Sequence, residues 1–190
     1  MVTYHSVNPL IIQQDNWLSD EDLEKIFSKH YDWKDGKVHA NGELTSNEIR
    51  KCKTHRIEYG DDEYFDSLIR RVAKYFNIEN LMQIEPLPLI RYDVGDYFNF
   101  HTDLTSGFKS QRISTMVMYL NDDFEGGHTI FHKSNMSIKP KRGSCLVYNY
   151  NTEEPMIHRG DIITSGSKYI LTAFVRDSEF TLTDRKLVSY

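Results

Sequence analysis

His101 and Asp103 are separated by one residue, at the end of a stretch, Tyr97–Asp103, whose composition predicts a β-strand. Side chains alternate between the two faces of a strand, so both groups would point to one face and could share a metal ion. A second imidazole from a distant part of the chain would complete a set of two histidines and one carboxylate. His158 is the best candidate. Such a set leaves coordination positions open and favours Fe(II).

A longer ordered string of residues surrounds these three positions. With x for any residue, it comprises Arg91-Tyr92, Gly95, His101-x-Asp103, Arg112, Thr115, Tyr119-Leu120-Asn121, Gly126-Gly127-x-Thr129-x-Phe131, Pro140, Gly143, His158, Gly166-x-Lys168 and Thr172. On this string, the sequence from about Arg91 to Arg176 resembles the catalytic core of the prolyl 4-hydroxylase branch of the 2-oxoglutarate- and Fe(II)-dependent oxygenases. An isolated His-x-Asp pair would be weak evidence, whereas the full ordered string is specific.

The resemblance implies that His101, Asp103 and His158 bind Fe(II), with 2-oxoglutarate and O2 as cosubstrates and ascorbate as a reductant. Hydroxylation would be coupled to decarboxylation of 2-oxoglutarate to succinate. Halogenases of the same superfamily replace the carboxylate with a small residue, so Asp103 implies hydroxylation instead.

The far carboxylate of 2-oxoglutarate needs a cation in a partly dry pocket, because a buried charge requires a partner. Lys168 matches the lysine that fills this role in the family. On a strand, Lys168 and Thr172 share a face, so both could reach that carboxylate. Tyr92 matches a family tyrosine that also contacts the cosubstrate, although a plain core role is an alternative.

Two further matches, Arg112 and Thr115, concern the substrate. The sequence leaves open whether Arg112 contacts substrate or only braces the fold. The chain also departs from the family pattern: His128 stands where glutamate is usual, His132 where proline is usual, and Phe174 where tryptophan is common. These departures affect the identity of the substrate more than the chemistry.

The resemblance favours a prolyl residue of a peptide or protein as the substrate, hydroxylated at C4. The segments Asp32–Glu48 and Leu104–Gln111 are candidate walls of a substrate groove, the first of them also a candidate lid. A free amino acid or another peptidyl side chain such as lysine is the first alternative. A metal-binding or sensing domain of the cupin type without turnover belongs to a different class, as does a purely structural jelly roll.

Composition limits the remaining possibilities. The chain has 190 residues, 39% of them hydrophobic, which is consistent with one folded domain. Its net charge of −5 argues against nucleic acid as a partner. The two cysteines indicate reduced thiols rather than a disulfide framework. No signal peptide or membrane-length apolar run is recognisable, so we expect a soluble cytoplasmic protein without a membrane partner. The oligomeric state stays open.

The elements that would position these residues fall into two parts. Residues 1–85 are expected to supply a first strand at Val7–Ile12, supporting helices, and a possible edge strand at 49–59. The helices are predicted from Ser19 to about Lys29 and over Asp61–Asn77, where apolar side chains recur at helical spacing.

Residues 86–177 are expected to form the catalytic core, because short apolar runs alternate there with turn residues. The eight strands are predicted near Leu87–Tyr92, Tyr97–Asp103, Arg112–Leu120, His128–His132, Met136–Lys139, Ser144–Tyr150, Met156–Thr164 and Lys168–Arg176. The predicted fold class is therefore α+β, mainly β, with a double-stranded β-helix or jelly roll. His128 and His132 would lie roughly 13 Å apart on a strand, so we reject them as a metal pair.

Overall fold

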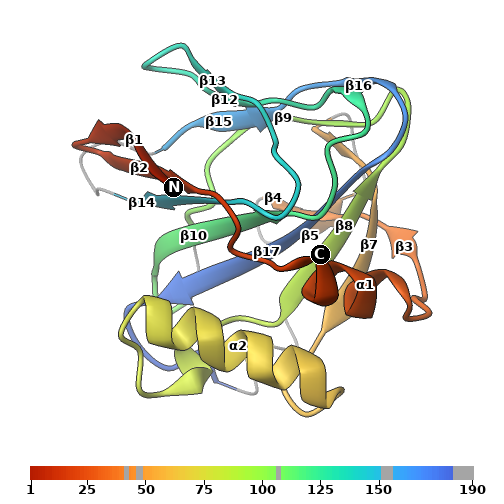
Figure 1. The fold of residues 1–190 in the computed structure, drawn as a ribbon. Coiled ribbons are helices and arrows are strands. Elements are labelled where there is room, and N and C mark those ends of the chain that lie inside the picture. Colours follow the sequence, from red (N-terminus) through yellow and green to blue (C-terminus); the bar gives the residue numbers. More distant parts are fainter. Residues whose placement is uncertain (41–42, 46–48, 106–107, 151–155, 182–190) are drawn as a thin grey trace.

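The computed structural model describes residues 1–40, 43–45, 49–105, 108–150 and 156–181. Two antiparallel sheets face each other, and two helices lie outside the larger one (Figure 1). This arrangement confirms the predicted double-stranded β-helix with supporting helices.

The larger sheet has eight strands in the order β1-β2-β14-β10-β17-β8-β7-β3. They span Val2–Val7 (β1), Leu10–Gln14 (β2), Cys145–Asn149 (β14), Arg112–Tyr119 (β10), Lys168–Arg176 (β17), Leu87–Tyr92 (β8), Lys53–Ile57 (β7) and Lys34–Asp35 (β3).

The smaller sheet has five strands in the order β13-β12-β15-β9-β6. They span Met136–Ile138 (β13), Thr129–Phe131 (β12), His158–Gly160 (β15), Tyr97–His101 (β9) and Arg50–Lys51 (β6). Two short pairs complete the strands: Val38–Ala40 (β4) with Glu43–Thr45 (β5), and Glu125–Gly126 (β11) with Ile163–Ser165 (β16).

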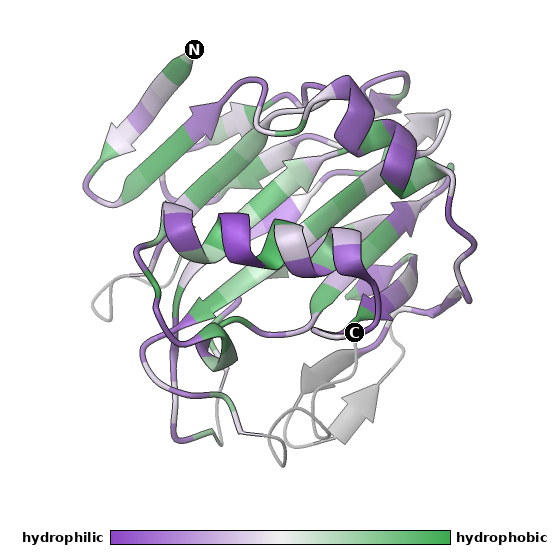
Figure 2. Ribbon diagram, turned by 60° about the horizontal axis from the view of Figure 1, so that its bottom comes forward, coloured by the Kyte–Doolittle hydropathy of each residue, from purple (hydrophilic) through white to green (hydrophobic). Residues whose placement is uncertain are grey.

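The helices cover the outer face of the larger sheet, as Figure 2 shows. Helix α1 spans Asp20–Phe27, with Ser19 as its N-cap in a capping box, and α2 spans Glu63–Tyr75, with Asp62 as its N-cap. A short 3-10 helix, Leu81–Gln83, follows α2. The apolar faces of both helices pack on alternate residues of the sheet. The helices contribute residues that include Leu23, Leu68 and Val72, and the sheet contributes residues that include Met116, Met118, Val147 and Leu171. None of the helices in the described residues is both long and apolar enough to cross a lipid bilayer.

The other residues of the same strands point between the two sheets. On β10, Met116 and Met118 face the helices, whereas Val117 and Tyr119 belong to the second core cluster, inside the jelly roll. The same alternation brings Tyr148 of β14 and Ile170 of β17 to the inner face. Strand register therefore decides which side chains of the larger sheet can reach a site between the sheets.

Several boundaries differ from the predicted ones. The first strand was predicted at Val7–Ile12, but the chain turns at Asn8-Pro9 between β1 and β2. Proline lacks the backbone donor of a sheet ladder, so it interrupts the run. The predicted strand at Met156–Thr164 is two strands, β15 and β16, in different sheets. Strand β9 ends at His101, so Asp103 lies in the loop beyond it.

Candidate metal and cosubstrate site

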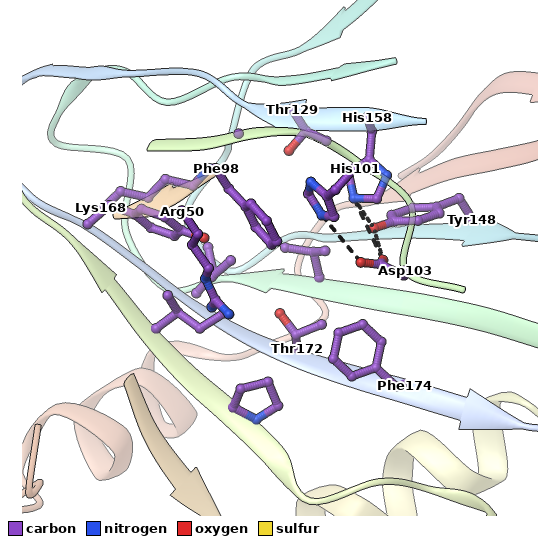
Figure 3. Close-up of a pocket in the computed structure, with 16 residues that line it drawn as sticks. Arg50, Phe98, His101, Asp103, Thr129, Tyr148, His158, Lys168, Thr172 and Phe174 are labelled. Carbon is purple, nitrogen blue, oxygen red and sulfur yellow. Dashed lines mark hydrogen bonds and ion pairs between the residues drawn. The ribbon is translucent and has the colours of Figure 1, made fainter. Parts of the chain in front are cut away.

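Three ligand groups converge at one side of a cavity between the sheets, as Figure 3 shows. His101 Nε2 lies 3.4 Å from Asp103 Oδ1, and His158 Nε2 lies 3.6 Å from Asp103 Oδ2. One ligand atom of each residue lies within 4.8 Å of the others, so the group could hold one metal ion. Strand pairing places the two histidines opposite each other, because His158 of β15 is the register partner of His101 of β9.

Both imidazoles present the same nitrogen to this point. His101 Nδ1 contacts the carbonyl of Asn99 at 2.7 Å, and His158 Nδ1 contacts that of Met156 at 2.7 Å. A carbonyl only accepts hydrogen bonds, so each Nδ1 carries a proton and Nε2 is the nitrogen that faces the other ligand groups. Burial, together with the charge of His101, lowers the pKa of His158 to about 4. The donor set and the orientation of the two imidazoles therefore fit a divalent cation.

Asp103 is ionised in this surrounding. Burial opposes its ionisation, but His158, His101 and Arg112 together hold the pKa of the carboxyl well below its usual range. The residue was predicted to share a face with His101 through strand alternation, and this reason is wrong because β9 ends before Asp103. Side chains of the larger sheet hold the carboxylate instead, since Thr115 Oγ1 lies 3.1 Å from Oδ2.

Lys168 lines the same cavity, away from the three ligand groups (Figure 3). Its ammonium donates to the carbonyl of Gly127 at 2.5 Å and lies 5.8 Å from the centre of the Tyr92 ring. Burial lowers the pKa of Lys168 to about 7, although the charge of Asp161 opposes this. Two other predicted residues line the same cavity. They are Thr172, on the same face of β17 as Lys168, and Tyr92 of β8, the register partner of Lys168. The predicted cosubstrate residues are thus brought together.

Arg112 is held outside this group. It is buried, forms two bonds to the Glu85 carboxylate at 2.6 and 2.7 Å, and donates to the backbone carbonyl of Asp103 at 3.0 Å. It is not among the described residues that line the cavity. This geometry favours the bracing alternative over substrate contact. Thr115, predicted with it as a substrate residue, is fully buried and contacts Asp103 instead.

Arg50 also lines the cavity, and it was not predicted as a site residue. Its guanidinium carbon lies 4.8 Å from the centre of the Phe98 ring, and that ring stacks on His101 with centroids 3.4 Å apart. Arg50 is 8% exposed, and its Nε has no hydrogen-bond partner within the described part of the chain. Neither its burial nor its stacking follows from spacing, because Arg50 lies on a two-residue strand in another part of the chain.

Tyr148 and Tyr150, which match no position of the family motif, were not predicted as site residues. Tyr148 and Tyr150 each donate to Asp103 Oδ2 at 2.8 Å. Alternation along a predicted strand, Ser144–Tyr150, would have placed both on one face, but nothing in the sequence indicated that this face meets Asp103.

Other predicted features lie elsewhere. His128 and His132 flank strand β12 and do not belong to the ligand group found among the described residues, as expected. Of the candidate groove walls, residues 41–42 and 46–48 of the first and 106–107 of the second lie outside the described residues. Cys52 and Cys145 are buried free thiols.

The chain is similar to known oxygenases in sequence and structure. Residues 87–176 match the 2OG-Fe(II) oxygenase superfamily. A protein of Acanthamoeba polyphaga mimivirus named "Putative prolyl 4-hydroxylase" is 28% identical over 165 residues, covering 75% of this chain and 68% of that protein. The crystal structure of a viral collagen prolyl hydroxylase from Paramecium Bursaria Chlorella virus-1, a 2-oxoglutarate complex, superposes with a TM-score of 0.69 at 22% identity, covering 88% of this chain and 96% of that one.

A third comparison involves a peptide complex. The prolyl hydroxylase of Trichoplax adhaerens, solved with a peptide of the oxygen degradation domain of hypoxia inducible factor, superposes with a TM-score of 0.64 at 15% identity, covering 95% of this chain and 87% of that one.

The fold, the ligand group and the family match identify residues 87–176 as an oxygenase core of the 2OG-Fe(II) superfamily. Within this class the chain is similar to prolyl 4-hydroxylases.

Proposed function

We propose that this protein hydroxylates a prolyl residue of a peptide or protein, with Fe(II) bound by His101, Asp103 and His158. The observation that carries the proposal is the convergence of these three groups with Lys168 on one cavity. A purely structural jelly roll has no need to gather a carboxylate, two imidazoles and an ammonium in one place, since each costs free energy to desolvate.

The roles of the chain's own residues follow from their positions. Lys168 pairs with the far carboxylate of 2-oxoglutarate, while Thr172 and Tyr92 line the same part of the cavity. Bound Fe(II) supplies the O2 chemistry that couples decarboxylation of 2-oxoglutarate to hydroxylation. The apolar walls formed by Val117, Ile170 and Phe174 limit the access of water to the reacting groups.

A prolyl substrate is favoured by the relatives, because those named above are described as prolyl hydroxylases and one was solved with a peptide. A free amino acid or another peptidyl side chain is the alternative within the same chemistry.

The test is reconstitution with Fe(II) and 2-oxoglutarate under anaerobic conditions, followed by succinate release in air. The assay contains a panel of proline-rich peptides, matched peptides in which alanine replaces proline, and free amino acids. We expect stimulation by proline peptides only, together with a mass gain of one oxygen on proline.

Other outcomes separate the competing functions. Stimulation by a free amino acid, or by a lysine peptide, would keep the oxygenase and replace the substrate. Binding of metal and 2-oxoglutarate without succinate release under any condition would support the sensing domain. The Asp103→Ala variant is the matched negative control, and turnover by that variant would contradict the assigned ligand set.

A further inference from the structure

The carboxylate of Asp103 is held mainly by the sheet opposite to the one that carries the two histidines. Asp103 lies beyond the end of β9, so sheet hydrogen bonds do not fix it. Arg112 of β10 donates to its backbone carbonyl at 3.0 Å. The Asp103 side chain accepts hydrogen bonds from residues of β10 and from residues on and directly after β14.

Three hydroxyl groups surround one oxygen of this carboxylate. Tyr148 and Tyr150 donate to Asp103 Oδ2 at 2.8 Å each, and Thr115 donates to the same atom at 3.1 Å. Thr115 and Tyr150 also contact each other through their hydroxyl groups. The other oxygen, Oδ1, is the atom nearest to His101, at 3.4 Å from its Nε2. The two carboxylate oxygens therefore have different surroundings.

Packing alone does not explain these hydroxyl groups. Tyr148 is 1% exposed and lies in the apolar cluster between the sheets, where a phenylalanine would fill nearly the same volume. A buried hydroxyl group costs free energy unless it is hydrogen-bonded. Both tyrosine hydroxyls find an acceptor in the Asp103 carboxylate.

The hydroxyl of Tyr148 also lies 3.0 Å from His158 Nε2. Its single proton can reach either acceptor. A cation on Nε2 would remove that choice, because the nitrogen lone pair is then used, and the proton would go to Asp103.

We infer that Tyr148 and Tyr150 are positioning residues that assign Asp103 Oδ2 to hydrogen bonding and reserve Oδ1 for the metal ion. This inference rests on the proposed function, in which Asp103 is a metal ligand. The two tyrosines make the carboxylate a one-oxygen ligand and orient it from the opposite sheet. Residues that orient a ligand in this way typically change metal affinity by about 10- to 100-fold when they are removed.

The experiment compares Tyr148→Phe and Tyr150→Phe with a matched control, Tyr119→Phe. Tyr119 is also a fully buried tyrosine of the inner face, but its hydroxyl bonds to Thr129 at 2.9 Å and not to Asp103. Each variant is titrated with Mn(II) and with Co(II) by calorimetry. The visible spectrum of the Co(II) form is recorded, and metal-free unfolding is followed by circular dichroism.

We expect Tyr148→Phe and Tyr150→Phe to weaken binding of both metals about tenfold or more and to change the Co(II) spectrum, because a released Oδ2 alters the coordination. Tyr119→Phe should keep the wild-type affinity and spectrum. Wild-type affinity and spectrum in both test variants would overturn the inference. An equal loss in the control would overturn it too, since the effect would then be structural.

Two provisions keep the outcomes distinct. Should Tyr148→Phe fail to fold, Tyr150→Phe alone decides, because the ring of Tyr150 is only partly buried. The wild-type titration tests the proposed function separately: a wild-type chain that binds neither metal would overturn the ligand assignment and the inference with it. If the wild-type chain binds the metals and both tyrosine variants keep its affinity and its Co(II) spectrum, the inference is overturned while the proposed function stands.

Discussion

At the scale of single residues, Lys168 carries the assignment of the cosubstrate site. Replacing it with methionine keeps most of the side-chain volume and removes the charge. We expect the 2-oxoglutarate concentration for half-maximal succinate release to rise about 100-fold or more, because an unpaired buried carboxylate costs several kcal/mol. The measurement is succinate release as a function of 2-oxoglutarate.

Lys168→Arg is the matched control and should recover part of the affinity, since it restores a cation at the same position. An unchanged requirement in Lys168→Met would move the role to another cation. Arg112 and Arg176 are poor substitutes because both are paired with Glu85. Arg50, which lines the cavity with an unpartnered Nε, would be the next candidate.

The buried ammonium also predicts a pH dependence of stability in the absence of ligands. Burial lowers the pKa of Lys168 from 10.5 to about 7 in the folded state. Below about pH 7, Lys168 is protonated in both the folded and the unfolded chain, so the folded chain carries the full cost of desolvating the ammonium. Between about pH 7 and 10.5, Lys168 is protonated only in the unfolded chain. The free energy of unfolding therefore rises with pH across this range. Lys168→Met should therefore be more stable than wild type at pH 6, by on the order of a few kcal/mol.

Urea unfolding of both forms at pH 6, 8 and 10 checks this expectation. The difference in the free energy of unfolding should shrink as the pH rises. A difference that is the same at all three values would show that Lys168 keeps an ordinary pKa.

At the scale of elements, a cluster of buried charged side chains connects the segment just before β8 to strands β10 and β17. Glu85 is fully buried and accepts from Arg112 on β10 and from Arg176 on β17, each through Nε at 2.6 Å. Arg176 also donates to the hydroxyl of Thr105, beyond Asp103, at 3.1 Å. The cluster thus anchors the loop that carries Asp103 to the larger sheet.

Glu85→Gln should lower the free energy of unfolding by about 3–5 kcal/mol, because it leaves two buried guanidinium groups without their carboxylate. Chemical denaturation provides the measurement. Glu21→Gln is the control, since Glu21 pairs with Lys25 on the surface of α1 and exposed pairs contribute about 0–1 kcal/mol. Similar effects of the two substitutions would mean that the buried cluster is not important for stability.

At the scale of the whole molecule, a bound metal would connect the two sheets. The histidines come from the smaller sheet, whereas Asp103 is held by residues of β10 and by tyrosines on and directly after β14 in the larger one. Anything that binds only the folded state stabilises it. Mn(II) at 100 times its dissociation constant should add about 2.7 kcal/mol and raise the Tm by roughly 5–10 °C.

Thermal unfolding with and without Mn(II) tests this linkage under conditions without turnover. His158→Ala should unfold near the temperature of the metal-free wild type and should not respond to the ion. A Tm rise of the same size in that variant would place the bound metal elsewhere.

Prediction from sequence succeeded where the signal is local. The two helices were predicted from apolar side chains at helical spacing, and β8 and β17 were predicted with their observed bounds. It failed at the turn of Asn8-Pro9 and at the end of β9. At both places the composition of the segment predicted one continuous strand, but the backbone leaves the sheet there.

The sequence by itself determined the ligand types, the class of chemistry and the strand alternation that puts Lys168 and Thr172 on one face, because these depend on residue identity and short spacing. Tertiary structure alone decided which distant groups complete the site. Tyr148, Tyr150, Glu85 and Arg50 have no distinguishing local pattern, and each matters through a partner far along the chain. Contacts between sheets depend on register and packing across the whole core, and no local spacing specifies them.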